Sequence, residues 1–160
     1  MSLENSLKSY LKQLSSLRSN QKMPEGWRYS SLEQLVLVEG SVFTEYVTVT
    51  NHDKMKDCFR NAFLRATSDR SLTYVEGYFM TDRLPLAIHH AWCVQSDGKV
   101  LDTTIRFKPD EQACYMGIPF DTDKMINAVM NEFDGYAGMF TPKGGFTNVE
   151  LMKHGQKAYA

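Results

Sequence analysis

Two strand-like segments separated by three turn-forming residues most constrain how this chain can fold. Residues 86–95 and 99–105 are rich in apolar and β-branched residues, and Ser96-Asp97-Gly98 lies between them. This pattern is typical of a β-hairpin, in which the loop length decides which residues lie opposite one another. The loop therefore also decides which side chains share a face of the sheet.

The first possible loop is the two-residue turn Asp97-Gly98. It places residue 93 opposite residue 102, so that His89 and Cys93 share a face with Asp102 while His90 points to the other side.

The second possible loop has three residues, with Gly98 in the left-handed conformation. Trp92 then lies opposite Asp102, and His90 lies diagonally from Asp102 on the same side. Glycine in the third loop position favours this alternative, which gathers an imidazole and a carboxylate. Cys93 falls on the opposite strand face from His90, and we expect it to be buried and inert.

A cysteine lies near the start of the helical segment that precedes the hairpin. Apolar residues between about Asp53 and Thr67 recur every three or four positions, which predicts a helix with Cys58 in its first or second turn. The positive end of a helix and a nearby imidazole both stabilise a thiolate. Singly, such residues are more often structural than catalytic. Together they indicate Cys58 as nucleophile, His90 as base and Asp102 as the group that orients the histidine.

The same residues resemble a known group of proteins. His90-Ala91-Trp92 and Asp102-Thr103-Thr104 are similar to the His-Ala-Trp and Asp-Pro-Thr segments of transglutaminase-like cysteine proteins, a branch of the papain-like fold. With Gly-Ile-Pro-Phe at 117–120, the chain also resembles small phage and bacterial proteins. The resemblance covers residues 58–104. It implies a triad of Cys58, His90 and Asp102, and it implies the three-residue loop.

Other site residues are proposed from their positions. An oxyanion hole needs a donor besides the backbone N–H of Cys58, and Asn51 or His52 is a candidate for it. The alternative for this segment is that Asn51 or Asp53 caps the helix. The candidates for lining a substrate pocket beside the thiol are Glu76, Tyr78, Trp92 and Tyr115.

We expect a single α+β domain over residues 1–160, in which the helix that carries the cysteine packs on a small antiparallel sheet, as in papain-like and transglutaminase-like proteins. The core spans about 27–135, preceded by an N-terminal helix at 2–18 and followed by a looser tail at 136–160. The remaining expected elements before the hairpin are a helix from Ser31 to Val38 ended by Gly40, a strand from Thr44 to Thr50 that residues 41–43 can extend, and a strand from Leu72 to Met80. After the hairpin we expect an irregular segment from Phe107 to Phe120 and a helix from about Asp123 to Phe133 that stops at Gly135, with Met125, Val129, Met130 and Phe133 facing the core. A short helix is expected around 148–154.

Composition and motifs exclude several functions. Lys and Arg number 18 against 19 Asp and Glu, so no global charge attracts nucleic acid or an anionic membrane. Apolar runs are too short to span a bilayer. The three cysteines are an odd number, which favours a reducing compartment and therefore the cytoplasm. Phosphate-binding loops and the common redox and zinc motifs are missing, so no cofactor is expected.

The leading hypothesis is a cysteine-dependent acyl-transfer enzyme acting through a thioester on a peptide or protein amide or another acyl substrate; it covers peptidases, amidases, deamidases and transglutaminases. A second hypothesis is a catalytically silent, phage-encoded fold that inhibits a host protein through its N-terminal helix or its Gly-rich tail. A third, a metal site, is disfavoured because His89 and His90 point to opposite faces of one strand.

Overall fold

The structure is a computed structural model that describes residues 1–133 and 138–160 of the 160-residue chain. The expected helix stop at Gly135 lies outside the described residues. In chain order the elements are α1 (Leu3–Arg18), α2 (Leu32–Glu39), β1 (Ser41–Phe43), α3 (Cys58–Ser68), β2 (Thr73–Thr81), β3 (Ile88–Val94), β4 (Val100–Leu101), β5 (Ala113–Phe120), α4 (Thr122–Asn131), α5 (Val149–His154) and the 3-10 helix η1 (Gly155–Tyr159). The expected α+β class is confirmed.

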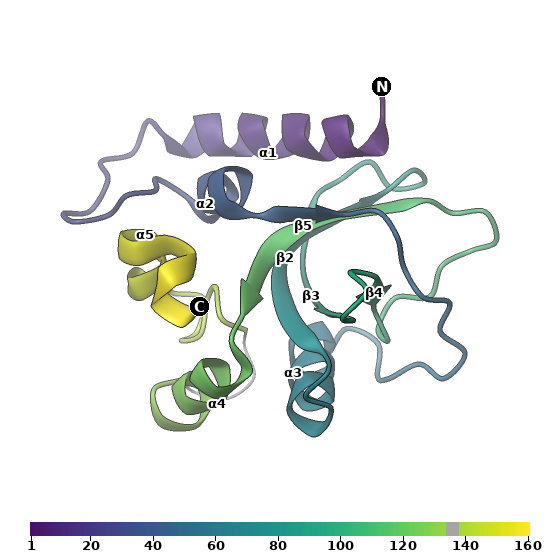
Figure 1. The fold of residues 1–160 in the computed structure, drawn as a ribbon. Helices are drawn as coiled ribbons and strands as arrows, with labels where there is room; N and C mark the ends of the chain where they lie inside the picture. The colour runs from purple at the N-terminus through teal and green to yellow at the C-terminus, as the bar shows by residue number, and fades with distance from the viewer. Residues whose placement is uncertain (134–137) are drawn as a thin grey trace.

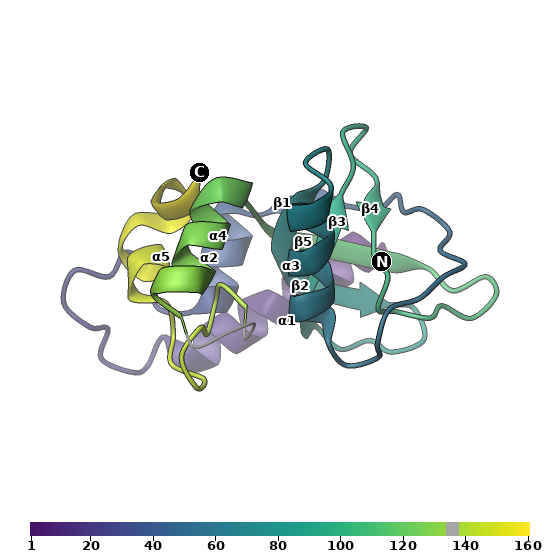
Figure 2. The same ribbon diagram turned by 90° about the horizontal axis from the view of Figure 1, so that it is seen from below.

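The strands form one antiparallel sheet in the order β1-β5-β2-β3-β4, with β2 and β5 paired along their length. The sheet is strongly curled (Figure 1). The helices pack on one side of it. Helices α1 and α2 pack against β5, and α3 packs against β2 and β3 (Figures 1 and 2).

The two faces of the sheet have different covers. The helix face carries Tyr78, Cys93 and Met116 and is buried under the helices. The loop face carries Phe79, Trp92 and Tyr115. Its cover comes from Phe43, Tyr46, Ile105 and Phe107, which belong to β1 and to the segments after β1 and β4.

The hairpin of β3 and β4 has the three-residue loop. Cys93 lies opposite Leu101, the backbone N–H of Gln95 donates to the carbonyl of Lys99, and Gly98 has φ of +85°. This register continues to Trp92 opposite Asp102. The three-residue alternative is therefore confirmed, and it places His90 and Asp102 on the loop face.

Two strand predictions were wrong. The segment 107–120, expected to be irregular, contains β5, whose residues Ala113–Phe120 pair with β2. A strand buried on both faces is apolar without alternation, and Gly117 and Pro119 weaken the strand signal further. Pro119 is tolerated because β1 pairs with β5 only from Tyr115 to Gly117. Of the strand expected at 44–50 with an extension over 41–43, only the extension forms a strand, β1 at Ser41–Phe43, and the rest contributes one bridge from Tyr46 to Val100.

The expected N-terminal helices are present, but two other helix predictions need correction. Helix α3 starts at Cys58, not near Asp53, because Lys56 has a left-handed φ of +63° that interrupts a first turn. In α4, Met125 is buried as expected, whereas Met130 is 68% exposed.

The described part of the C-terminal tail, residues 138–160, is packed and not loose. Met139, Phe140 and Leu151 are each at most 1% exposed. Asn148 caps α5, and its side-chain amide donates to the carbonyl of Met139 at 2.8 Å. The glycines in this segment allow tight turns and do not prevent burial. Within the described residues, the structure has no helix with the length and apolar character needed to cross a bilayer.

Candidate active site

Cys58 is the first residue of α3 and is partly exposed. The side chain of Asp57, the N-cap residue, makes no capping hydrogen bond to the first turn of the helix. Asn61, one turn later, donates from Nδ2 to the carbonyl of Lys54 at 2.8 Å and to Oγ1 of Thr104 at 2.9 Å. These bonds join the start of the cysteine helix to the chain segment that follows Asp102.

A second set of contacts fixes the same junction. The carboxylate of Asp53 accepts two hydrogen bonds from Arg65 of α3, at 2.9 and 3.0 Å, and one from the hydroxyl of Thr103. The bonds from Arg65 are the main reason that the pKa of Asp53 is lowered. Asp53 therefore clamps α3 to the end of the hairpin, and it does not cap the helix.

His90 and Asp102 form a buried pair. His90 Nε2 lies 2.7 Å from Oδ2 of Asp102, with side chains only 4% and 2% exposed. Asp102 Oδ2 also accepts a hydrogen bond from the hydroxyl of Tyr115 at 3.0 Å. Asp102 Oδ1 accepts from the backbone N–H groups of Thr104 and Ile105 at 3.0 and 3.3 Å. The carboxylate is thus held in one orientation and holds the imidazole in turn.

Charge interactions shift both pKa values of this pair. Burial alone would lower the pKa of His90, but the charge and hydrogen bond of Asp102, together with the Cys58 side chain, outweigh burial and raise it to about 9. Burial would raise the pKa of Asp102, and His90 with the Thr104 and Tyr115 hydrogen bonds lowers it instead. Because Cys58 contributes to the shift of His90, the thiol and the imidazole lie within interaction range. The Nε2 of His90 faces Asp102, which leaves Nδ1 for the thiol.

A cavity of about 530 Å³ opens beside the thiol. Cys58, His89 and His90 supply its reactive side chains. The remaining lining residues are Met55, Lys56, Phe59, Phe79, Ile88, Thr104, Ile105 and Arg106. The structure therefore places Cys58 and His90 in the wall of one cavity, with the buried Asp102 bonded to His90 behind it.

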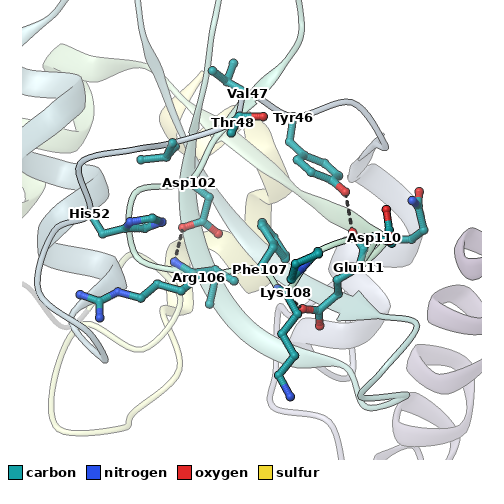
Figure 3. Close-up of a pocket in the computed structure, with 14 residues that line it drawn as sticks. Tyr46, Val47, Thr48, His52, Asp102, Arg106, Phe107, Lys108, Asp110 and Glu111 are labelled. Atoms are coloured by element: carbon teal, nitrogen blue, oxygen red, sulfur yellow. Dashed lines mark hydrogen bonds between the residues drawn. The ribbon is translucent and has the colours of Figure 1, made fainter.

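The candidates for the second oxyanion donor lie elsewhere. His52 lines a neighbouring cavity of about 510 Å³ that lies between residues 46–49 and 105–112 and shares Ile105 and Arg106 with the cavity beside Cys58. Figure 3 shows the His52 ring beside the Asp102 carboxylate. Asn51 is exposed and is not among the described residues that line either cavity.

The four substrate-pocket candidates are buried, with exposures between 0 and 6% for Glu76, Tyr78, Trp92 and Tyr115. They are not among the described residues that line the cavity beside Cys58. Tyr115 instead supports Asp102. Cys93 is 1% exposed, donates to the carbonyl of Ala62 at 3.3 Å, and has a pKa raised to about 12 chiefly by burial. The expectation that Cys93 is buried is confirmed.

A second histidine and carboxylate, which the sequence alone did not reveal, adjoin the site. His89 Nε2 lies 2.8 Å from Oε1 of the fully buried Glu76. Glu76 also accepts from the hydroxyl of Tyr74 and from the backbone N–H groups of Met139 and Phe140, at 2.5 to 3.0 Å. Two of these donors come from the C-terminal segment, so only the folded chain shows the connection.

Within the described part of the chain, no group of three or more His, Cys, Asp or Glu residues is arranged to hold a metal ion. No protein-family model, curated protein or solved structure matches the chain. The class of the protein therefore rests on its own geometry: an α+β fold in which a thiol at a helix start and a histidine on a strand line one cavity, and an aspartate after the hairpin partner strand binds the histidine.

Proposed function

We propose that this protein is a cysteine-dependent acyl-transfer enzyme of the peptidase, amidase, deamidase or transglutaminase type, working in the cytoplasm. The observation that carries the proposal is the buried 2.7 Å contact between His90 and Asp102, with Cys58 and His90 lining the same cavity. We further propose a papain-like or transglutaminase-like arrangement, since α3, β3 and the aspartate after β4 follow the order of that family.

The chemistry proceeds in two steps. Cys58 Sγ attacks the carbonyl carbon of the substrate, and His90, which has taken the thiol proton, gives it to the leaving amine as the C–N bond breaks. The product is a thioester on Cys58. Water or a second amine then attacks the thioester, His90 accepts its proton, and the thiol is restored. Asp102 remains ionised and keeps His90 oriented throughout.

Negative charge that develops on the carbonyl oxygen needs hydrogen-bond donors. The backbone N–H of Cys58 stands at the positive end of α3, where the dipole favours an anion. His89 lies in the same cavity wall with its Nε2 engaged by Glu76, and it takes the place that was expected for Asn51 or His52 as a candidate second donor.

The test is the alkylation of Cys58 by iodoacetamide near neutral pH, followed by peptide mass spectrometry. We expect Cys58 to react quickly and Cys93 and Cys114 to remain unmodified, because both are 1% exposed. His90→Gln should slow the reaction of Cys58 by about 10²-fold or more, since the thiol loses its base. His154→Gln, at an exposed histidine of α5, is the matched control and should react like the unmodified protein.

Formation of the acyl-enzyme is measured with p-nitrophenyl acetate. We expect one acetyl group on Cys58, removable by hydroxylamine, in the wild-type protein and not in Cys58→Ala. If Cys58 is alkylated no faster in wild type than in His90→Gln, and no acetyl group is found, the enzyme proposal fails. The alternative of a catalytically silent protein that binds a host partner then becomes the better interpretation.

A further inference from the structure

The charges around the cavity beside Cys58 are all of one sign. Apolar side chains form most of its wall, including Phe59, Phe79 and Ile88. Lys56 and Arg106 lie at its exposed edge, and His89 and His90 are the other basic side chains. Among the described residues that line this cavity, none is aspartate or glutamate.

These two cations differ from other basic residues nearby. Lys54 lies 3.9 Å from Asp57, and Arg65 is bound to Asp53 at 2.9 Å. Lys56 and Arg106 have no carboxylate within ion-pair distance in the part of the chain that the structure describes. A basic side chain without a partner at the mouth of an apolar cavity attracts an anion, and the planar guanidinium of arginine fits a carboxylate with two parallel hydrogen bonds.

We propose that the cavity beside Cys58 selects substrates whose acyl part is apolar and carries a carboxylate close to the reacting carbonyl. The apolar wall takes the hydrocarbon part, and Lys56 and Arg106 bind the carboxylate. This inference rests on the function proposed above and names the substrate class of the same site. The carboxylate belongs either to an acidic side chain of a peptide or to a small organic acid, and the experiment separates the two.

The test compares two alkylating reagents of similar size, the anionic iodoacetate and the neutral iodoacetamide. In each, Cys58 Sγ displaces iodide, which leaves with the bonding electrons, while the thiol proton passes to His90. The rate with iodoacetate is divided by the rate with iodoacetamide, and the result is divided by the same ratio for N-acetylcysteine amide, a free thiol without net charge. We call the resulting value the charge preference. This charge preference corrects for the intrinsic difference between the reagents. We expect a value of roughly 10 for the wild-type protein.

Single substitutions of the two cations should reduce the charge preference. Lys56→Gln and Arg106→Gln should each lower it about threefold, the effect expected of one exposed unit charge in largely aqueous surroundings, and high salt should do the same. Lys108→Gln, two residues from Arg106 and outside this cavity, is the matched control and should leave the charge preference unchanged. The positive charge of His90 contributes equally in every variant.

The outcomes separate this inference from the proposed function. If iodoacetamide reacts quickly and depends on His90, but Lys56→Gln and Arg106→Gln keep the wild-type charge preference, the substrate class is wrong and the enzyme proposal stands. Slow, His90-independent alkylation by both reagents contradicts the enzyme proposal itself. A charge preference that falls in Lys56→Gln and Arg106→Gln and stays at the wild-type value in Lys108→Gln supports the inference.

The source of the carboxylate is tested by protection of Cys58 from iodoacetamide. Protection by glutarate alone assigns a small acid, whereas protection by acetyl-Leu-Glu-amide assigns an acidic peptide. Equal protection by the neutral compounds glutaramide and acetyl-Leu-Gln-amide, or no protection by any of the four, contradicts the inference.

Discussion

Replacing Asp102 with asparagine keeps the size of the side chain and removes its charge. Oδ1 of Asp102 accepts from two backbone N–H groups, so the oxygen of the new amide must stay at that position. The NH₂ group then replaces Oδ2 and donates toward Nε2 of His90. His90 must carry its proton on Nδ1, the nitrogen left for the thiol, and it can no longer take the proton of Cys58. We expect alkylation of Cys58 to slow to the rate of the His90→Gln variant.

The same substitution changes how stability depends on pH. In the wild type the pKa of His90 rises from 6.5 to about 9, which corresponds to about 3 kcal/mol of stabilisation. Because this pKa is raised by folding, the stabilisation is complete below pH 6.5 and is lost as the pH rises through about 9. Without the carboxylate, burial dominates and lowers the pKa of His90. The free energy of unfolding of the variant therefore falls as the pH falls, whereas the contribution of His90 in the wild type rises as the pH falls.

The assay is urea unfolding of both proteins between about pH 5.5 and 9.5. The difference in free energy of unfolding should be about 3 kcal/mol or more at the acidic end and shrink above pH 9. Asp97→Asn, the same change at an exposed position in the loop of the same hairpin, should give a pH profile parallel to the wild type. If the Asp102→Asn profile is also parallel to the wild type, the His90 and Asp102 pair is not ionised as described.

Three further substitutions test the surroundings of the site. Gly77 lies on the central strand β2 opposite His90, and Gly77→Ala would put a methyl group 2.2 Å from the carbonyl oxygen of Met116 in β5. We expect the free energy of unfolding in urea to fall by more than about 3 kcal/mol, and a fall below about 1 kcal/mol would contradict the packing. Tyr115→Phe removes one hydrogen-bond donor to Asp102 and should lower the free energy of unfolding by about 1 kcal/mol. It should also raise the pKa of the Asp102 carboxyl in an NMR titration, and an unchanged pKa would contradict this role. In Glu76→Gln an NH₂ group replaces one carboxylate oxygen and faces two hydrogen-bond donors, so we expect the free energy of unfolding to fall by about 3 kcal/mol. An unchanged free energy of unfolding would mean that the four hydrogen bonds are not all formed.

The sequence was most informative where a local rule has long-range consequences. Gly98 indicated a three-residue loop, and the loop length decided which residues of β3 lie on the same face of the sheet as Asp102. His90 was placed beside Asp102 on that basis. The sequence was least informative where partners lie far apart along the chain. Nothing near Glu76 indicates that Met139 and Phe140 supply its donors.

Two other differences have local physical causes. Strand β5 was missed because a strand buried on both faces has no alternation, and Gly117 leaves room for the ring of Trp92, which would lie 2.7 Å from an added Cβ. The position of His52 could not be derived because residues 44–53 depend on packing over the loop face and not on hydrogen bonds within a regular element.

The carboxylate of Glu76 also bears on the order in which the protein assembles. During synthesis, β2 and β3 leave the ribosome well before the segment that contains Met139 and Phe140. Until that segment docks, a buried acid on the central strand lacks two of its four hydrogen-bond donors, and the wall of the cavity that His89 forms lacks its anchor. A nascent chain that already contains Cys58, His90 and Asp102 would therefore lack part of the wall of the proposed site until the segment with Met139 and Phe140 has been made and has docked.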